Sequence, residues 1–409
     1  MIPVENIKTK YGSEIALVVL CCRLHFGTED RSSLQKFIAN NTVNWEYVKY
    51  LSRYHRIAPI VYKTLAAASL PTETALQIKQ KHLYLIQQSF KRALETEWII
   101  NLLQENSISC APYKGIAFSR QFYGDIVSRE SSDIDLIIIP DRFDKVIELM
   151  EANGYRFENR VEYNYYNEAI FSRRKDLNFN KYKNNTREFH VEFHWRITNN
   201  ALLIKKETNT LLFQNNEDIL LAKNKVKGLN ANAHYMAILI HHSTSDGFSV
   251  LRNIIDIGQA VSDQSSLDTA YIKKCLNDFN LTKAGEICNF LCKELLGIIL
   301  PFTIDNKKNI SAKVKKYFIE QLLQKKRIGD YLKVTLYRKS IFYLKSSARD
   351  KISYLIASFR LRFKPSVKDL RIFKFPKTLH FLYFIIKPLR SLISPASAIE
   401  EKEIVRNQK

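Results

Sequence analysis

Two carboxylates stand one residue apart where a strongly apolar stretch begins. Asp133 immediately precedes the segment 134–139, and Asp135 lies within it. The apolar, β-branched character of this segment predicts a buried strand. Alternate side chains of a strand point to the same face, so both carboxylates are expected on one face, where they repel unless a cation lies between them. Carboxylate oxygens suit hard divalent ions, and the pattern therefore predicts a Mg²⁺ or Mn²⁺ site.

A lysine and a glycine upstream of this strand indicate a place for phosphate. Lys114 and Gly115 separate a strand-like run, 108–113, from a helix-like run, 116–123. A glycine at such a turn lets a phosphate approach the backbone and the N-terminus of the helix. The side chains expected to contact phosphate oxygens are those of Lys114, Arg129 and either Ser131 or Ser132.

A second strand is predicted at 188–197, where apolar and polar residues alternate cleanly. Its polar face carries a carboxylate, an imidazole and a guanidinium, and its apolar face carries three bulky side chains. The polar face consists of Glu192, His194 and Arg196, and the apolar face of Val191, Phe193 and Trp195. If this strand pairs beside 134–139, Glu192 completes a cluster of three carboxylates.

Together these features resemble the DNA polymerase β-type nucleotidyltransferase superfamily. Its pattern is a glycine-containing turn, then Asp-x-Asp on a strand, then a third acidic residue on a later strand. More narrowly, residues 40–260 resemble a family of uncharacterised nucleotidyltransferases. The matching positions are Lys114-Gly115, Tyr123, Arg129, Asp133, Asp135 and His194-Trp195-Arg196. Ile116 follows Gly115 where the wider superfamily has a second glycine or a serine, and the gap to Asp133 is longer than is usual there.

The resemblance implies a metal-dependent enzyme that transfers a nucleoside monophosphate from an NTP donor to an acceptor hydroxyl and releases pyrophosphate. Asp133, Asp135 and Glu192 would be catalytic and would bind Mg²⁺ or Mn²⁺. Glu192 would lie nearest the attacking hydroxyl, as a metal ligand or as a base acting through it. Lys114, Gly115, Arg129 and Ser132 would bind the nucleotide.

The acceptor is open: a glycan precursor, a metabolite or a modified peptide. Two alternative functions also remain, an enzyme that adds nucleotides to RNA or tRNA, and a non-catalytic membrane-associated scaffold with the same fold.

A later segment, 233–261, resembles a histidine-rich helical part of the same family. The matching residues are His241, His242, Arg252 and Asp256. Arg252 and Asp256 either line the nucleotide or acceptor cleft or form an i,i+4 ion pair that packs the helix. His194 and Arg196 are further candidates for the cleft.

Length and composition describe a globular chain of several domains. The 409 residues are 46% hydrophobic and 25% charged. We expect an α+β fold: a small mixed β-sheet nucleotidyltransferase core with flanking helices, an N-terminal helical scaffold and a C-terminal all-helical region. The chain is expected to be helical from 216 onward. The expected parts are an N-terminal helical region at 1–106, the catalytic core at 107–200, a helical domain at 201–305 and a basic, aromatic-rich helical tail at 306–409.

The net charge of +22 is concentrated in the tail, where 26 Lys and Arg follow residue 306 against 7 Asp and Glu. Basic and apolar residues interleave over 310–395, which suits a segment lying on an anionic membrane surface. An ordinary helical subdomain is the alternative, and RNA binding is a further, less favoured one. The six cysteines show no metal-binding spacing, and neither a secretory signal nor a membrane span is evident. We therefore expect a cytoplasmic protein, with peripheral attachment to the inner membrane face as one option.

Overall fold

A computed structural model describes residues 1–68, 70–158, 160, 163, 174–198, 216–262, 267–302, 310–324, 333–345, 347–361, 369, 372–373 and 375–393. The chain divides into two compact units, each described here by itself. The first unit comprises 1–157 and 175–326, and the second comprises 158–174 and 327–409.

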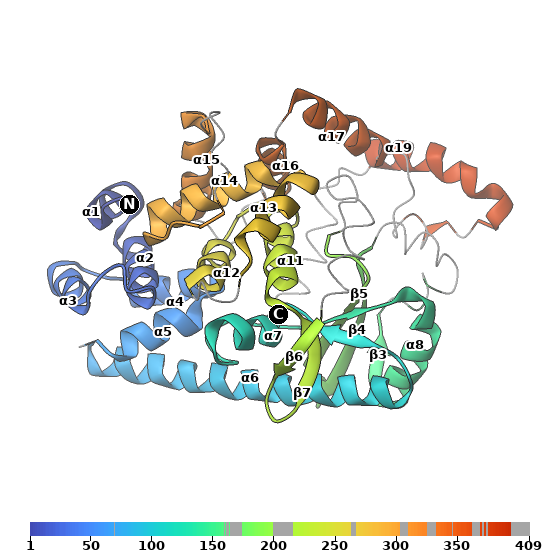
Figure 1. Cartoon of the computed structure of the whole chain (residues 1–409), viewed down its shortest axis with the longest axis horizontal. Coiled ribbons are helices and arrows are strands. Elements are labelled where there is room, and N and C mark those ends of the chain that lie inside the picture. The colour runs from blue at the N-terminus through green and yellow to red at the C-terminus, as the bar shows by residue number, and fades with distance from the viewer. Residues whose placement is uncertain are drawn as a thin grey trace. The chain divides into compact units, whose positions relative to one another are not determined.

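Six helices precede the sheet, in the N-terminal region that the sequence predicts to be helical. They are α1 (Val4–Tyr11), α2 (Ser13–His25), α3 (Arg31–Asn40), α4 (Trp45–Tyr54), α5 (Ala58–Ala66) and α6 (Thr72–Glu105). Helix α2 is buried along most of its length and forms the centre of this group. The 34-residue helix α6 extends along the bottom of Figure 1, from α5 to the sheet.

The central sheet has five strands in the order β1-β2-β5-β4-β3. The strands are β1 (Cys110–Pro112), β2 (Ile134–Ile138), β3 (Tyr155–Phe157), β4 (Asp176–Lys183) and β5 (Thr186–His194). Strands β2 and β5 are parallel neighbours, and the other pairs are antiparallel. This pairing confirms the mixed sheet and the predicted contact between the two strands that carry carboxylates. The η2 turn (Pro140–Arg142) and helix α8 (Phe143–Ala152) follow β2.

The structure differs from the predicted elements at several places. The helix expected at 116–123 is one α-helical turn, α7 (Gly115–Phe118), continued by a π-helical turn, η1 (Ser119–Tyr123). The chain after 216 is not wholly helical, because β6 (Asn216–Leu220) and β7 (Lys225–Leu229) form a hairpin. Strand β4 was not predicted. The helical domain expected from 201 begins, within the described residues, with that hairpin.

The rest of the first unit is helical. It contains α11 (Ala231–Thr244), α12 (Leu251–Ser262), α13 (Thr269–Asp278), α14 (Thr282–Leu291), the π-helical turn η4 (Cys292–Leu296) and α15 (Ala312–Leu323). Nearly every residue of α11 and α12 is buried, so these two helices form the core that faces the catalytic elements.

The second unit contains three helices and a 3₁₀ turn among its described residues. They are α16 (Lys333–Leu344), α17 (Ala348–Leu361), η5 (Lys377–Leu382) and α19 (Tyr383–Ile393). Tyr383 is buried against Phe373 and Phe375. Among the described residues, no helix has both the length and the apolar character that a bilayer crossing requires.

Candidate active site

Polar side chains from three neighbouring strands meet on one face of the sheet. The register pairs Asp135 of β2 with Glu192 of β5, and it pairs His194 of β5 with Asp176 of β4. The His194 Nε2 atom lies 2.8 Å from Asp135 Oδ1 and 3.1 Å from Glu192 Oε2. Of the predicted cluster of three carboxylates, Asp135 and Glu192 therefore meet on this face, and His194 and Asp176 join them.

These side chains fit a divalent cation. Donor atoms of Asp135, Glu192 and His194 all lie within 4.8 Å of one another. Two carboxylates and an imidazole form a donor set that Mn²⁺ accepts readily, and the carboxylates alone suit Mg²⁺. Asp133 does not belong to this group. It lies one residue before β2, half-buried, where Ser131 Oγ donates to its backbone oxygen at 2.7 Å and lies 3.3 Å from its carboxylate.

Two lysines contact the same carboxylates. Lys114 Nζ lies 3.2 Å from Asp135 Oδ1, and Lys175 Nζ lies 3.2 Å from Glu192 Oε2 and also pairs with Asp176. Burial raises the pKa of the Asp135 carboxyl, but Lys114 and a hydrogen bond from His194 outweigh it and leave that pKa below its usual range. The Asp135 carboxylate is thus held in its charged form.

Glu192 is held in the same way. Burial raises the pKa of its carboxyl, whereas Lys175 and hydrogen bonds with His190 and His194 bring that pKa well below the ordinary value. Burial lowers the pKa of Lys175, but Glu192 outweighs it and the pKa of this ammonium is raised. The sequence reasoning missed Lys175. No local pattern in the sequence distinguishes it from a solvated surface lysine.

The Lys114–Gly115 turn has a backbone conformation that requires a glycine at position 115. Gly115 has φ +41°, and a Cβ on it would lie 2.9 Å from Ser131 Oγ, so only glycine fits this close approach. Lys114 has φ +56°, a strained conformation for a side chain of its size. Its backbone N–H donates to His234 Nε2 at 3.0 Å, and this bond helps to hold the strained turn.

His234 is a buried, neutral histidine that fixes this turn. Because Nε2 accepts the Lys114 N–H, Nδ1 carries the proton, and it lies 2.6 Å from Gln121 Oε1. Burial and the nearby Arg129 lower the pKa of His234 to about 3. Its place on the apolar helix α11 resembles that of any core histidine, so no local pattern selects it.

A second polar network joins the segment before β2 to helix α12. Arg129 Nε lies 3.1 and 3.0 Å from the two carboxylate oxygens of Asp256. Tyr123 donates its hydroxyl to Asp256 at 2.9 Å, and His242 Nε2 lies 2.8 Å from the same carboxylate. Burial raises the pKa of Asp256, but Arg129 and His242 outweigh it and lower that pKa. Arg129, Tyr123 and His242 therefore meet at the buried Asp256 carboxylate, which occupies the Nε of Arg129.

Arg252 does not form the i,i+4 ion pair proposed as one of its two roles. Within the described residues, the ion-pair partner of Asp256 is Arg129, not Arg252. The Arg252 guanidinium instead donates from Nη1 to the backbone oxygen of Glu130 at 3.3 Å. Arg196 lies beyond the end of β5, where its backbone N–H donates to Lys175.

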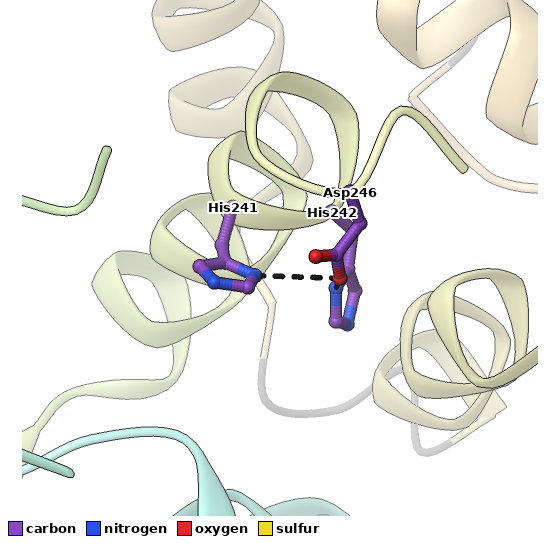
Figure 2. Close-up of side chains that lie close together, drawn as sticks. All are labelled: His241, His242 and Asp246. Carbon is purple, nitrogen blue, oxygen red and sulfur yellow. Dashed lines mark hydrogen bonds and ion pairs between the residues drawn. The ribbon is translucent and has the colours of Figure 1, made fainter. Parts of the chain in front are cut away.

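A second histidine–aspartate group, His241, His242 and Asp246, also has donor atoms within 4.8 Å of one another (Figure 2). Both nitrogens of His242 already have partners: Nε2 faces Asp256, and Nδ1 lies 2.8 Å from Asn253 Nδ2. His241 Nδ1 is 3.6 Å from Asp246. Because binding a metal would break the hydrogen bonds of His242, we interpret this group as an extension of the Asp256 network.

The remaining predicted residues occupy the edge of the site. Ser132 is exposed, and its neighbour Ser131 is the serine that contacts both Gly115 and Asp133. Of the two serines considered, Ser131 is therefore the one built into the turn.

A comparison with protein families identifies the same region. The family model described as uncharacterised nucleotidyltransferase matches residues 41–297, which include the sheet, the Lys114–Gly115 turn and the Asp256 network. No curated protein and no solved structure gives a significant match. The match spans more than half of the chain and supports nucleotidyl transfer as the general activity. The chain belongs to the family of uncharacterised nucleotidyltransferases.

Proposed function

We propose that the protein transfers a nucleoside monophosphate from an NTP to the hydroxyl of an acceptor, with release of pyrophosphate. The observation that carries this proposal is the parallel pairing of β2 and β5, which sets Asp135 beside Glu192 on one sheet face. The strained turn at Lys114 and Gly115 lies against the segment that leads into β2. Charged carboxylates and a phosphate-binding turn thus adjoin, as in-line phosphoryl chemistry requires.

The metal ligands in this proposal are Asp135 and Glu192, with His194 as a third. A divalent cation bound there supplies charge neutralisation on the transferred phosphoryl group and acidifies the acceptor hydroxyl. The imidazole favours Mn²⁺ over Mg²⁺. Asp133, next in the chain to the strand, is proposed as a further ligand from its Asp-x-Asp spacing alone.

The phosphates of the NTP are proposed to lie at the Lys114–Gly115 turn. Lys114 presents an ammonium beside Asp135, where positive charge offsets that of the β- and γ-phosphates. Ser131, and less directly the exposed Ser132, flank the turn. Arg129 acts as a positioning residue in this account, because Asp256 holds its Nε and thereby fixes the segment before β2.

Glu192 is better suited to bind a cation than to act as a base. A general base works best with a pKa near the operating pH. Lys175 and two histidines lower the pKa of Glu192 well below its usual value, so it holds a proton poorly. The sequence left two roles open for Glu192, metal ligand and base, and we therefore favour the role of metal ligand.

Binding of ATP, GTP, CTP and UTP, measured by calorimetry with and without Mg²⁺ or Mn²⁺, tests this function. Binding is preferable to turnover because the acceptor is unidentified. Metal-dependent binding of one nucleotide that is lost in Asp135→Asn supports the proposal. If no nucleotide binds the wild-type protein with either metal, the proposal fails and the scaffold alternative replaces it.

The second unit is proposed to contact an anionic membrane surface. Four apolar side chains of α17 are exposed at the i, i+3, i+4, i+7 spacing of one helix face, in a tail rich in basic residues. They are Ile352, Leu355, Ile356 and Phe359. Such a face with surrounding positive charge suits an anionic bilayer better than RNA, which has no apolar surface of that kind.

Co-sedimentation of the full-length protein with anionic and neutral vesicles tests this contact, with an RNA gel shift at the same salt concentration. We expect sedimentation with anionic vesicles that Ile352→Glu reduces and that Ser353→Glu, which adds the same charge at an exposed neighbouring position, reduces less. An RNA shift without vesicle binding would contradict the membrane proposal. The cytoplasmic, peripheral location expected from the sequence belongs to this proposal.

A further inference from the structure

Four arginines from separate parts of the N-terminal and C-terminal helices of the first unit gather around one carboxylate. Arg53 lies in the last turn of α4, Arg56 follows that helix, Arg92 lies on α6 and Arg252 lies on α12. Burial raises the pKa of the Glu130 carboxyl. The four guanidinium charges lower that pKa, with the largest effect from Arg252 and the smallest from Arg53. We refer to Arg53, Arg56, Arg92 and Arg252 as the arginine cluster.

The positive charge of the arginine cluster is not matched by ion pairs. In the part of the chain that the structure describes, none of the four guanidiniums lies within 4 Å of a carboxylate oxygen. Glu130 Oε2 is itself buried without a hydrogen-bond partner in that part. The half-buried Glu130 therefore acts on all four guanidiniums, while Asp133 acts on Arg92 and Asp246 and Asp256 act on Arg252 from beyond ion-pair distance.

Arg252 is the most constrained member of the cluster. Its residue is 8% exposed, and its Nη1 donates to the Glu130 backbone oxygen at 3.3 Å. Its Nε is buried and has no hydrogen-bond partner among the described residues. Burial, Arg56 and Arg129 lower the pKa of Arg252 to about 10. A buried donor without a partner is unfavourable unless a ligand supplies the acceptor.

The backbone holds Arg56 and Arg252 close together. The N–H groups of Leu251 and Arg252 donate to His55 Nδ1 at 3.2 Å and to the His55 backbone oxygen at 3.3 Å. Arg56, the next residue, has φ +55°, which is uncommon for a residue with a side chain. Two fixed elements thus present neighbouring guanidiniums.

The cluster adjoins the proposed active site. Burial lowers the pKa of Arg92, and the charge of Asp133 has the largest effect in the other direction. Glu130 is separated from Asp133 only by Ser131, which contacts the Gly115 turn, and by Ser132. The arginines therefore lie along the segment that connects the phosphate turn to the carboxylates.

We propose that the arginine cluster is a binding site for a phosphoryl group of a reactant. Planar guanidiniums bind phosphate oxygens through paired, charge-assisted hydrogen bonds, and Arg252 Nε provides a donor already withdrawn from water. The phosphoryl group belongs either to the NTP, as its terminal phosphate, or to the acceptor, as a phosphate ester. The site's part in the reaction rests on the proposed function, but its affinity for phosphate does not.

Calorimetric titration of the full-length protein with inorganic phosphate at constant ionic strength tests the site. The variants are Arg252→Gln and the double change Arg53→Gln with Arg56→Gln, which alters only exposed side chains and keeps the test valid if Arg252→Gln unfolds. Arg142→Gln, at an exposed arginine of η2, is the matched control. We expect the phosphate Kd to rise about tenfold in the double variant and to stay unchanged in the control. Equal phosphate affinity in the wild type, the double variant and the control would overturn the proposal.

The same titration under saturating NTP and Mg²⁺ distinguishes the two sources. If the acceptor supplies the phosphoryl group, phosphate still binds and the double variant keeps the wild-type affinity for NTP. If the NTP supplies it, NTP displaces phosphate and the double variant loses about tenfold in affinity for NTP but not for NMP. Either result supports a phosphoryl site. Asp135→Asn separates this inference from the proposed function. If this variant binds phosphate but no nucleotide, the phosphoryl site stands independently of the proposed function.

Discussion

The first unit contains two polar clusters that the family pattern brings together in sequence but that the fold uses differently. In the Asp256 network, the carboxylate is fully buried and both of its oxygens are hydrogen-bonded. In the cluster around Asp135, two carboxylates share an imidazole and two lysines within 3.2 Å. The Asp256 network is fully hydrogen-bonded and connects α12 to the segment before β2. The cluster around Asp135 concentrates like charges on one sheet face and retains donors for a cation.

Residues of one sequence motif can therefore have different structural roles. Arg129 and Asp135 belong to the same Arg-x-x-x-Asp-x-Asp pattern, yet Arg129 faces α12 and Asp135 faces β5. A buried ion pair contributes mainly by the penalty for breaking it, whereas a surplus of carboxylates is unfavourable without a ligand. The two clusters should therefore respond oppositely in stability and in activity.

The largest expected effect is on activity in Asp135→Asn. Removing this charge takes away a proposed ligand of the cation that would neutralise the transferred phosphoryl group, and we expect nucleotidyl transfer to fall about a thousandfold. The urea midpoint should fall less than in Arg129→Met, because the neutral amide loses the contact with Lys114 but is also relieved of repulsion from Glu192. Transfer at the wild-type rate in this variant would remove Asp135 from the mechanism.

Arg129→Met should have the opposite profile. It leaves Asp256 buried without its cation, and breaking a buried pair in this way destabilises by about 3 kcal/mol. Urea unfolding followed by circular dichroism measures this loss. If the variant is as stable as the wild type, the Arg129–Asp256 pair does not stabilise the contact between α12 and the segment before β2.

The pH dependence of stability should reveal His234. Its pKa is about 3 in the folded protein and 6.5 by ordinary reference, so between these values the unfolded chain binds a proton that the folded chain does not. Stability therefore falls as the pH decreases from 6.5 toward 3, by up to about 1.4 kcal/mol per pH unit from this group. His234→Gln, which keeps an acceptor for the Lys114 N–H, should reduce this slope. The free energy of unfolding is measured with urea at pH 7, 6 and 5. If its slope against pH is the same in the wild type and in His234→Gln, His234 is not a buried neutral histidine.

The smallest expected effect is on nucleotide affinity in Lys114→Ala. Loss of one charge-assisted contact to phosphate should raise the Kd for NTP about tenfold. Mn²⁺ affinity should change less, since Lys114 repels a cation rather than binding it. If the variant alters neither affinity, the phosphate role of Lys114 is wrong.

Sequence reasoning reached the parts of the site whose pattern is local. Alternation in 188–197 was enough to place Glu192 and His194 on one strand face, and the apolar run after Asp133 was enough for β2. Strand β4 escaped because its inward polar residues, Asp176 and Asn178, are types that strands usually lack. Their burial at the site, not their propensity, explains them.

The long-range partners were beyond local pattern. Asp256 has a cation four residues away, Arg252, and the proximity rule for helices selects that pair. The fold instead brings Arg129, which is distant in sequence, to both oxygens of Asp256. Lysines are normally solvated, so Lys175 could not be recognised before the register of β4 and β5 placed it beside Glu192.

The most direct test of the account is Mn²⁺ binding, followed by electron paramagnetic resonance of the free ion, in wild type, Asp135→Asn and His241→Gln. These variants compare the two groups whose donor atoms could hold a metal. The account predicts that Asp135→Asn loses Mn²⁺ binding and that His241→Gln keeps the wild-type affinity. Mn²⁺ binding that survives Asp135→Asn but is lost in His241→Gln would contradict it and move the metal site to α11.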